Sequence, residues 1–151
     1  MRLKYIVLVL LTMTVACGGP RATVGADGGA LELEKEQVWQ LVAMRGKEVS
    51  RSNDAVVLMF HPESGTLRGR VACNGYFGDY ELRGVRVGAE GTRYSMEVRY
   101  VSGGDVQCPE GDMAAQERYL SLLGKADACL LTPWSLTLFQ KGREVLKYEL
   151  Q

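Results

Sequence analysis

The chain has 151 residues, with 18 basic and 18 acidic side chains and a formal net charge of zero. This length leaves room for one domain, and the 46% share of hydrophobic residues is typical of a globular protein. Charges of both signs are interspersed and form no basic stripe, so the composition argues against a nucleic-acid partner.

The first sixteen residues have the layout of a secretory signal. Arg2 and Lys4 give a positive start, residues 5–15 form an apolar run, and Ala16 precedes Cys17. The run is too short to span a bilayer as a helix, which needs about 20 residues, and a small residue before the cysteine suits a cleavage site. We predict a signal peptide over residues 1–16. Its removal leaves 18 − 2 = 16 basic and 18 acidic side chains, a charge of −2.

The segment Thr14-Val15-Ala16-Cys17 resembles a bacterial lipobox. The resemblance implies diacylglycerol on the Cys17 sulfur, cleavage before Cys17 and acylation of the new amino terminus. Each buried methylene contributes about 0.8 kcal/mol, and stable anchoring takes more than one acyl chain, so a triacylated cysteine would hold the protein on a membrane. The alternative is a plain cleaved signal and a soluble product.

Residues 17–35 are rich in glycine and have no apolar period, which predicts a flexible, lipid-anchored tether before a domain over residues 36–151. Residue 18 is glycine, so the aspartate that retains some lipoproteins at the inner membrane is absent. We therefore expect a location in the cell envelope, with the outer membrane favoured over the inner membrane and the domain facing the periplasm or the surface.

Short strands separated by turns dominate the rest of the sequence. Alternation places Tyr94, Met96, Val98 and Tyr100 on one apolar face, as in an antiparallel sheet that is covered on one side. Apolar, β-branched runs bounded by turn residues predict further strands. These strands cover Glu36–Met44, Ala55–Phe60, Thr66–Val71, Gly78–Arg83 and Val85–Val87, the last two flanking Gly84.

One helix is predicted after Pro109, with Asp112 as its cap and Gly124 near its end. Its apolar stripe combines Met113, Glu117, Leu120 and Leu123 with Tyr119, Leu122 and Ala126. A closing hairpin turns at Lys141-Gly142, with Trp134, Leu136 and Leu138 on one strand and Leu146, Tyr148 and Leu150 on the other. The fold class is therefore α+β: a single small domain, mainly antiparallel sheet with one packed helix.

Four features, taken in this order, resemble the META/HslJ domain family over residues 37–150. They are Trp39-Gln40-Leu41, the block from Gly69 to Tyr80, Cys108-Pro109 with the helix over 117–123, and the hairpin from Trp134 to Leu138 with Lys147-Tyr148-Glu149. The residues that carry the signature are Trp39, Gly69, Cys73, Asn74, Gly78, Tyr80 and Cys108. The resemblance implies a shared fold, frequent lipoprotein membership and, for some members, a link to stress or drug tolerance. It brings no catalytic residues.

With Cys17 acylated, three cysteines remain, and the sequence alone does not choose among their three pairings. The family places the surroundings of Cys73 and Cys108 near each other, which makes them the candidate disulfide in an oxidising compartment. A loop of about 35 residues would give roughly 3–4 kcal/mol from loop-closure entropy. Cys129 would then be a buried, inert thiol in an apolar strand.

Other residues suggest structural roles. His61, the only histidine, is expected in a turn beside Pro62, and no cysteine pair or nucleophile stands at ligand or triad spacing from it. Asn74-Gly75 is expected to turn the chain or to cap backbone groups. Tyr76, Phe77 and Tyr80 are expected to pack in the core. We therefore predict no catalytic residue, no cofactor and no metal site.

These observations favour a monomeric, non-enzymatic envelope lipoprotein that has an envelope-stress or partner-binding role. Its expected partners are a membrane, through the lipid on Cys17, and an unidentified protein or small molecule. One alternative is a carrier of a small hydrophobic ligand, which requires a continuous internal cavity. A second alternative is a thiol-based enzyme that depends on Cys129.

Overall fold

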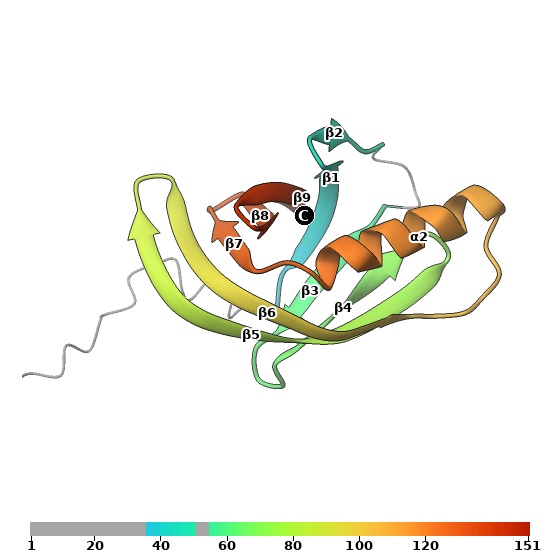
Figure 1. Cartoon of the computed structure of the whole chain (residues 1–151), viewed down its shortest axis with the longest axis horizontal. Helices are drawn as coiled ribbons and strands as arrows, with labels where there is room; N and C mark the ends of the chain where they lie inside the picture. Colours follow the sequence, from blue (N-terminus) through green and yellow to red (C-terminus); the bar gives the residue numbers. More distant parts are fainter. Residues whose placement is uncertain (1–35, 51–54) are drawn as a thin grey trace, which may run out of the picture.

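The computed structural model describes residues 36–50 and 55–151. The predicted signal peptide, Cys17 and the predicted tether lie outside the described residues. Within residues 36–50 and 55–151, nine strands and one helix follow one another, and Figure 1 shows their arrangement. They are β1 (Val38–Met44), β2 (Lys47–Glu48), β3 (Val57–His61), β4 (Thr66–Val71), β5 (Asn74–Gly88), β6 (Gly91–Gly103), α2 (Glu110–Leu123), β7 (Ala128–Leu131), β8 (Ser135–Gln140) and β9 (Arg143–Leu150).

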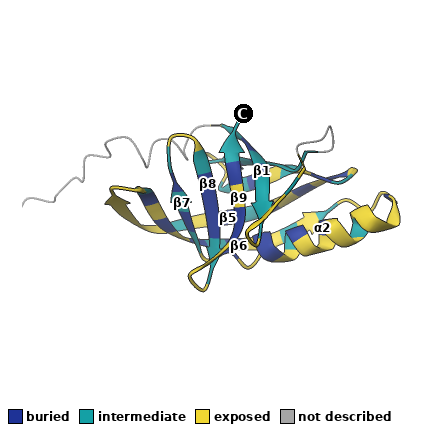
Figure 2. Cartoon of the chain, turned by 90° about the horizontal axis from the view of Figure 1, so that it is seen from above, coloured by how far each residue is buried: buried dark blue, intermediate teal, exposed yellow. Residues whose placement is uncertain are grey.

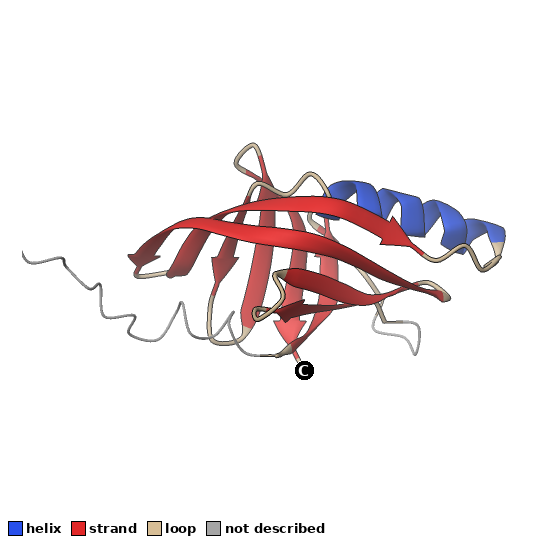
Figure 3. Ribbon diagram, turned by 90° about the horizontal axis from the view of Figure 1, so that it is seen from below, coloured by secondary structure: helices blue, strands red, loops and turns tan. Residues whose placement is uncertain are grey.

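The sheet closes into a barrel of eight antiparallel strands. Its order is β1-β3-β4-β5-β6-β7-β8-β9, and β1 also pairs with β9, with Trp39 opposite Leu150. The short β2 pairs with β1 alone, outside the ring. Closure satisfies backbone groups that an open sheet would leave at two edges. The α+β prediction of antiparallel strands with one packed helix is confirmed, and the closed barrel makes it more specific (Figure 3).

The hairpin of β5 and β6 is longer than the sequence predicted. The two strands expected on either side of Gly84, together with residues 74–77, form the single strand β5. Gly84 has φ +61°, and the register with β6 shifts between Arg83 and Val85. The glycine therefore makes a β-bulge instead of ending the strand, because only one extra residue has to be accommodated there.

A second bulge corrects the predicted position of Tyr100. The residues expected to share its face, Tyr94, Met96 and Val98, are buried, but Tyr100 has φ +53° and is 79% exposed. The register shifts between Phe77 and Asp79, so two residues of β6 oppose one of β5. The extra residue reverses the alternation, which turns the Tyr100 ring outward and packs Val101 against the core.

Helix α2 begins earlier than predicted and is capped differently. Pro109 occupies the N-cap position, where no side chain makes a capping hydrogen bond, and Asp112 lies inside the first turn, beside the positive end of the helix dipole. The buried face consists of Gln116, Tyr119, Leu122 and Leu123. Glu117, expected on that face, is exposed. The buried face of the helix therefore includes Gln116, because hydrogen bonds to Asn74 and Gly104 satisfy this polar side chain.

The closing hairpin turns where the sequence predicted, but its first strand begins one residue later than predicted. Lys141 and Gly142 both have positive φ, the geometry of a tight type I′ hairpin. Trp134 was predicted to begin the first strand, yet β8 begins at Ser135 and the Trp134 side chain is 76% exposed. The inward positions of β8 and β9 are filled by Leu136, Leu138 and other buried residues (Figure 2).

No helix among residues 36–50 and 55–151 is both long enough and apolar enough to cross a membrane. Helix α2 and the tip of the β5–β6 hairpin lie at opposite ends of the long axis of the domain (Figure 1).

Candidate functional site

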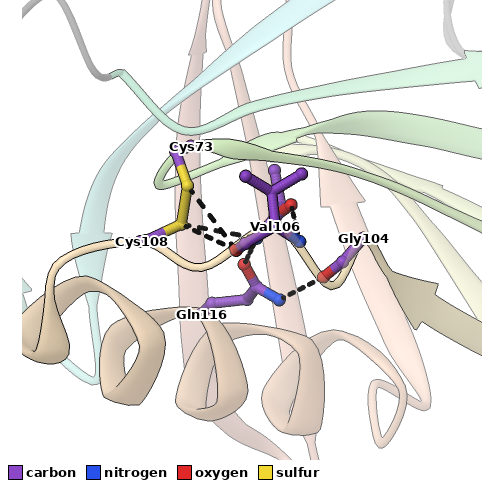
Figure 4. The surroundings of a disulfide bond; sticks show 6 residues. Cys73, Gly104, Val106, Cys108 and Gln116 are labelled. Atoms are coloured by element: carbon purple, nitrogen blue, oxygen red, sulfur yellow. Dashed lines mark hydrogen bonds between the residues drawn. A yellow bond between two sulfur atoms is a disulfide. The ribbon is translucent and has the colours of Figure 1, made fainter.

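A disulfide joins the β4–β5 turn to the loop that leads into α2. Cys73 and Cys108 are bonded across a sequence separation of 35, with 5.8 Å between their Cα atoms (Figure 4). The predicted pairing is thus confirmed. The closed loop contains the whole of the β5–β6 hairpin, so the bond restricts the denatured chain by roughly 3–4 kcal/mol.

Asn74 connects this disulfide to helix α2. Its Nδ2 group donates to the Val106 carbonyl and to Gln116 Oε1, both at 2.9 Å, and its Oδ1 accepts from the Val106 backbone N–H at 3.1 Å. Gln116 Nε2 donates in turn to the Gly104 carbonyl at 3.1 Å (Figure 4). We call Cys73, Asn74, Cys108 and Gln116 the clamp. Because Asn74 and Gln116 are buried and paired, they hold the 104–108 loop and α2 against the barrel.

The structural interpretation of Asn74 as a capping residue is confirmed, but the predicted turn at Asn74-Gly75 is wrong. The chain reverses at Ala72-Cys73, where Ala72 has φ +52°, and Asn74 already pairs with Val71 as the first residue of β5. The disulfide and the hydrogen bonds of Asn74 hold the flanking residues, which allows a non-glycine residue to adopt this conformation.

Three tyrosines form a hydrogen-bonded chain in the barrel interior. The hydroxyls of Tyr76 and Tyr119 are 2.6 Å apart, those of Tyr119 and Tyr148 are 3.1 Å apart, and Tyr76 donates to the Val57 carbonyl at 2.8 Å. Burial raises the pKa of all three hydroxyls above the ordinary value of 10.0. The three phenols therefore stay neutral at physiological pH and fasten α2 to β5 and β9.

The structure explains why position 69, in the block that carries the family resemblance, is a glycine. A Cβ atom at this position would overlap the Val57 carbonyl oxygen and would lie 2.5 Å from the Tyr76 hydroxyl. Only glycine leaves room for the Tyr76 ring to cross β4 and reach the Val57 carbonyl on β3. The glycine is thus required by the tyrosine chain and not by a turn.

The barrel interior is filled by large side chains. Trp39, Phe60, Tyr119 and Tyr148 are each at most 2% exposed and lie among buried leucines. Phe60 also packs edge-on against Tyr80, with 4.8 Å between ring centroids. A carrier of small hydrophobic ligands needs continuous internal space, so this packing argues against that alternative.

Cys129 lies in β7 as the free thiol of the described residues and is buried, as expected. Desolvation raises its pKa from 9.0 to about 12, against weaker opposing effects of Tyr94 and Arg93. Because the thiolate is the nucleophilic form, a thiol that stays protonated and inaccessible is poorly suited to catalysis. These properties of Cys129 argue against the alternative of a thiol-based enzyme.

His61 is the last residue of β3, directly before Pro62, so it ends a strand and does not lie in the turn itself. Its Nδ1 lies 2.8 Å from Glu36 Oε1. These two residues border an open concavity of about 710 Å³ with Glu63 and Arg68. Over residues 36–50 and 55–151, no group of three or more histidine, cysteine, aspartate or glutamate side chains gathers to hold a metal ion.

An aromatic and basic surface covers the outer wall of β4, β5 and β6. Phe77, predicted to lie in the core, is 64% exposed, because Tyr76 and Tyr80 take the inward positions on either side of it. It pairs with Arg68 on β4 and Ser102 on β6, and Tyr100 lies diagonally across from it. We call Arg68, Phe77, Arg99 and Tyr100 the outer-wall surface. Strict alternation counted from Tyr76 would have predicted the outward direction of Phe77.

Charged groups continue this wall toward the hairpin tip. Arg83 contacts Glu81 at 3.0 Å and Glu97 at 2.6 Å, and Arg99 contacts Glu81 at 3.3 Å. The hydrogen bond from Arg83, followed by its charge, lowers the pKa of Glu81 below 4.5. These ion pairs are exposed and add little stability, but they direct the Arg99 guanidinium toward Glu81.

Comparison with known proteins relates this barrel to other chains. A family model described as the META domain matches residues 30–151. An NMR structure of a protein from Burkholderia xenovorans has a TM-score of 0.57 and 19% identity, covering 81% of this chain and 86% of that one. A second NMR structure has a TM-score of 0.54 and 19% identity, covering 79% and 92%. At this identity the two structures show a shared fold alone. No curated protein matches the sequence.

Proposed function

The chain belongs to the META domain family, and on that premise we propose that it is a non-catalytic protein of the bacterial cell envelope, anchored by lipid on Cys17. It binds a protein partner through the outer-wall surface and supports the envelope under stress. The anchor is in the outer membrane, and the domain faces the periplasm or the surface. The observation that carries the proposal is the Cys73–Cys108 disulfide. Such bonds persist in oxidising compartments and are rare in the cytosol, which agrees with the signal-like residues 1–16.

The outer-wall surface supports the choice of a protein partner. Interface positions that contribute most to binding are enriched in aromatic residues and arginine. The outer-wall surface brings both types together on the three neighbouring strands β4, β5 and β6. The paired strands hold the backbone of these residues, so binding would lose little backbone entropy. Arg68 favours a partner that offers a carboxylate beside apolar side chains, whereas Arg99 already contacts Glu81.

Crosslinking on intact membranes tests this function. The anchored protein is crosslinked in cells under envelope stress, purified and compared with Phe77→Ser and Tyr100→Ser, with Arg143→Ala in the β8–β9 hairpin as the matched control. We expect one crosslinked partner that both serine variants lose and the control retains. The Cys17→Ser form should lose it as well, because the anchor sets the location. A crosslinking pattern that neither Phe77→Ser nor Tyr100→Ser changes would refute the assignment of this wall.

A further inference from the structure

Several segments that are distant in sequence meet at the rim of the barrel where β1 begins. At this rim Trp39 pairs with Leu150, His61 pairs with Thr66, and Thr92 pairs with Leu131. We call it the β1 rim. It comprises residues 36–37, 62–65, 88–91, 132–134 and Gln151.

Trp134 projects from this rim on a backbone that is held firmly. The Thr132 hydroxyl accepts hydrogen bonds from the backbone N–H groups of Trp134, at 3.3 Å, and Ser135, at 2.9 Å. The Trp134 carbonyl accepts from the Leu150 N–H at 3.0 Å. The loop is therefore fixed on both sides while its indole remains largely in water. A rigid, exposed tryptophan can be buried by a partner with little loss of backbone entropy.

The tip of the β5–β6 hairpin lies directly beside this loop. A Cβ atom at Gly91 would overlap the Leu131 carbonyl oxygen and would approach the Thr132 methyl group to 3.3 Å. Val87, one residue before the tip, is 72% exposed. The charges here are mixed, since Arg86 pairs with Arg93 across the hairpin, Glu90 lies in its turn and Glu63 lies in the β3–β4 turn. Because the charges are mixed, a partner of this rim would be bound mainly through the exposed apolar side chains.

We propose that the β1 rim docks on the phospholipid bilayer that holds the Cys17 anchor, with Trp134 and Val87 in the boundary between headgroups and acyl chains. This inference rests on the proposed anchoring. The described domain begins at this rim, and the 18 residues from 18 to 35 can extend no more than about 60 Å. The anchored end of the barrel is thus the end that bears the exposed indole. Tryptophan is enriched at membrane interfaces because its ring is apolar and its N–H is polar.

The two tryptophans of the chain make a direct test possible. Trp39 is 2% exposed in the core, so Trp134 is the one whose fluorescence reports on the rim. The protein is purified from membranes, its lipid is verified by intact mass, and it is reconstituted into phosphatidylethanolamine–phosphatidylglycerol vesicles with plain or brominated acyl chains. We expect brominated chains to reduce the Trp134 contribution about twofold, because interfacial groups lie roughly 5–10 Å deep.

Variants separate the possible outcomes. Trp134→Phe should leave a residual emission from Trp39 that brominated chains do not quench, whereas Phe77→Ala, on the outer wall, should behave as wild type. Equal Trp134 emission in both kinds of vesicle would overturn docking while leaving the anchor intact. Iodide, a quencher dissolved in the water, gives a second measurement. If Trp134 is protected from iodide but is not quenched by brominated chains, a protein covers the rim, and docking on the bilayer is overturned. An unmodified Cys17 would overturn both proposals.

Discussion

Replacing Asn74 by alanine tests how much of the stability of the domain depends on the clamp. The substitution removes three strong hydrogen bonds, two to Val106 backbone groups and one to Gln116, together with a weaker one from Nδ2 to Cys108 Sγ. Each contributes about 1 kcal/mol net, and Gln116 Oε1 is left buried without this donor, so we expect a loss of about 3–4 kcal/mol. Val106 is exposed, and water can solvate its freed backbone, which keeps the loss near the lower value.

The measurement is urea unfolding at neutral pH with the disulfide intact, where a lower midpoint at an unchanged slope reports lost stability. Gln116→Ala should lose about 2 kcal/mol, because it removes the bond to Asn74 and the bond to the Gly104 carbonyl. The double variant should lose about 1 kcal/mol less than the sum, since the two single changes remove one shared bond.

A matched control is Gln107→Ala, since Gln107 lies in the same loop and is exposed. It should change stability by less than about 0.5 kcal/mol. A loss below about 1 kcal/mol for Asn74→Ala would refute the reasoning. So would additive effects of the Asn74 and Gln116 substitutions, because they would mean that the hydrogen bond between the two side chains adds nothing.

Three further changes test the barrel, the thiol and the disulfide. Gly69→Ala should cost about 3 kcal/mol in urea unfolding, because its Cβ overlaps the Val57 carbonyl oxygen. The free energy of unfolding should fall by up to about 1.4 kcal/mol per pH unit above pH 9, where an unfolded Cys129 ionises but the folded thiol, with a pKa of about 12, does not. The free energy of unfolding of the Cys129→Ala variant should fall less steeply from pH 8 to 10. Replacing Cys73 and Cys108 together by serine should cost roughly 3–4 kcal/mol.

Each of these changes has a control or a contradicting result. Gly75→Ala places its Cβ no closer than 3.8 Å to a neighbour and should be nearly neutral, so equal losses at positions 69 and 75 would contradict the steric argument. Identical pH profiles for wild type and Cys129→Ala would mean that the thiol does not titrate as described. A double serine variant as stable as wild type would show that the disulfide does not constrain the unfolded chain.

The sequence predicts local structure well where one side of a strand is buried. Alternation from Tyr94 to Val98 and the Lys141-Gly142 turn both correspond to the structure. Closure of the barrel was not predicted, because it depends on β1 meeting β9, more than a hundred residues away. The Tyr100 bulge was missed for a similar reason: an inserted residue reverses the alternation without a proline or glycine at that position to mark it.

The candidate surfaces were less predictable than the clamp. The paired cysteines and Asn74 followed from a family resemblance, and the structure brings them together. Phe77 was expected in the core, because apolar residues near strands usually pack inside, and Trp134 was expected on the first strand of the closing hairpin. Their exposure becomes visible only when the register of β5 and the first residue of β8 are known.

Intact-mass analysis of the protein isolated from membranes tests the central claim, anchoring through Cys17, most directly. If Cys17 is the anchor, the chain begins at Cys17, carries the added mass of a diacylglycerol group and an amide-linked acyl chain, and partitions into a detergent phase. A chain that still begins at Met1, or one that starts at Cys17 without lipid and stays in the aqueous phase, would contradict it.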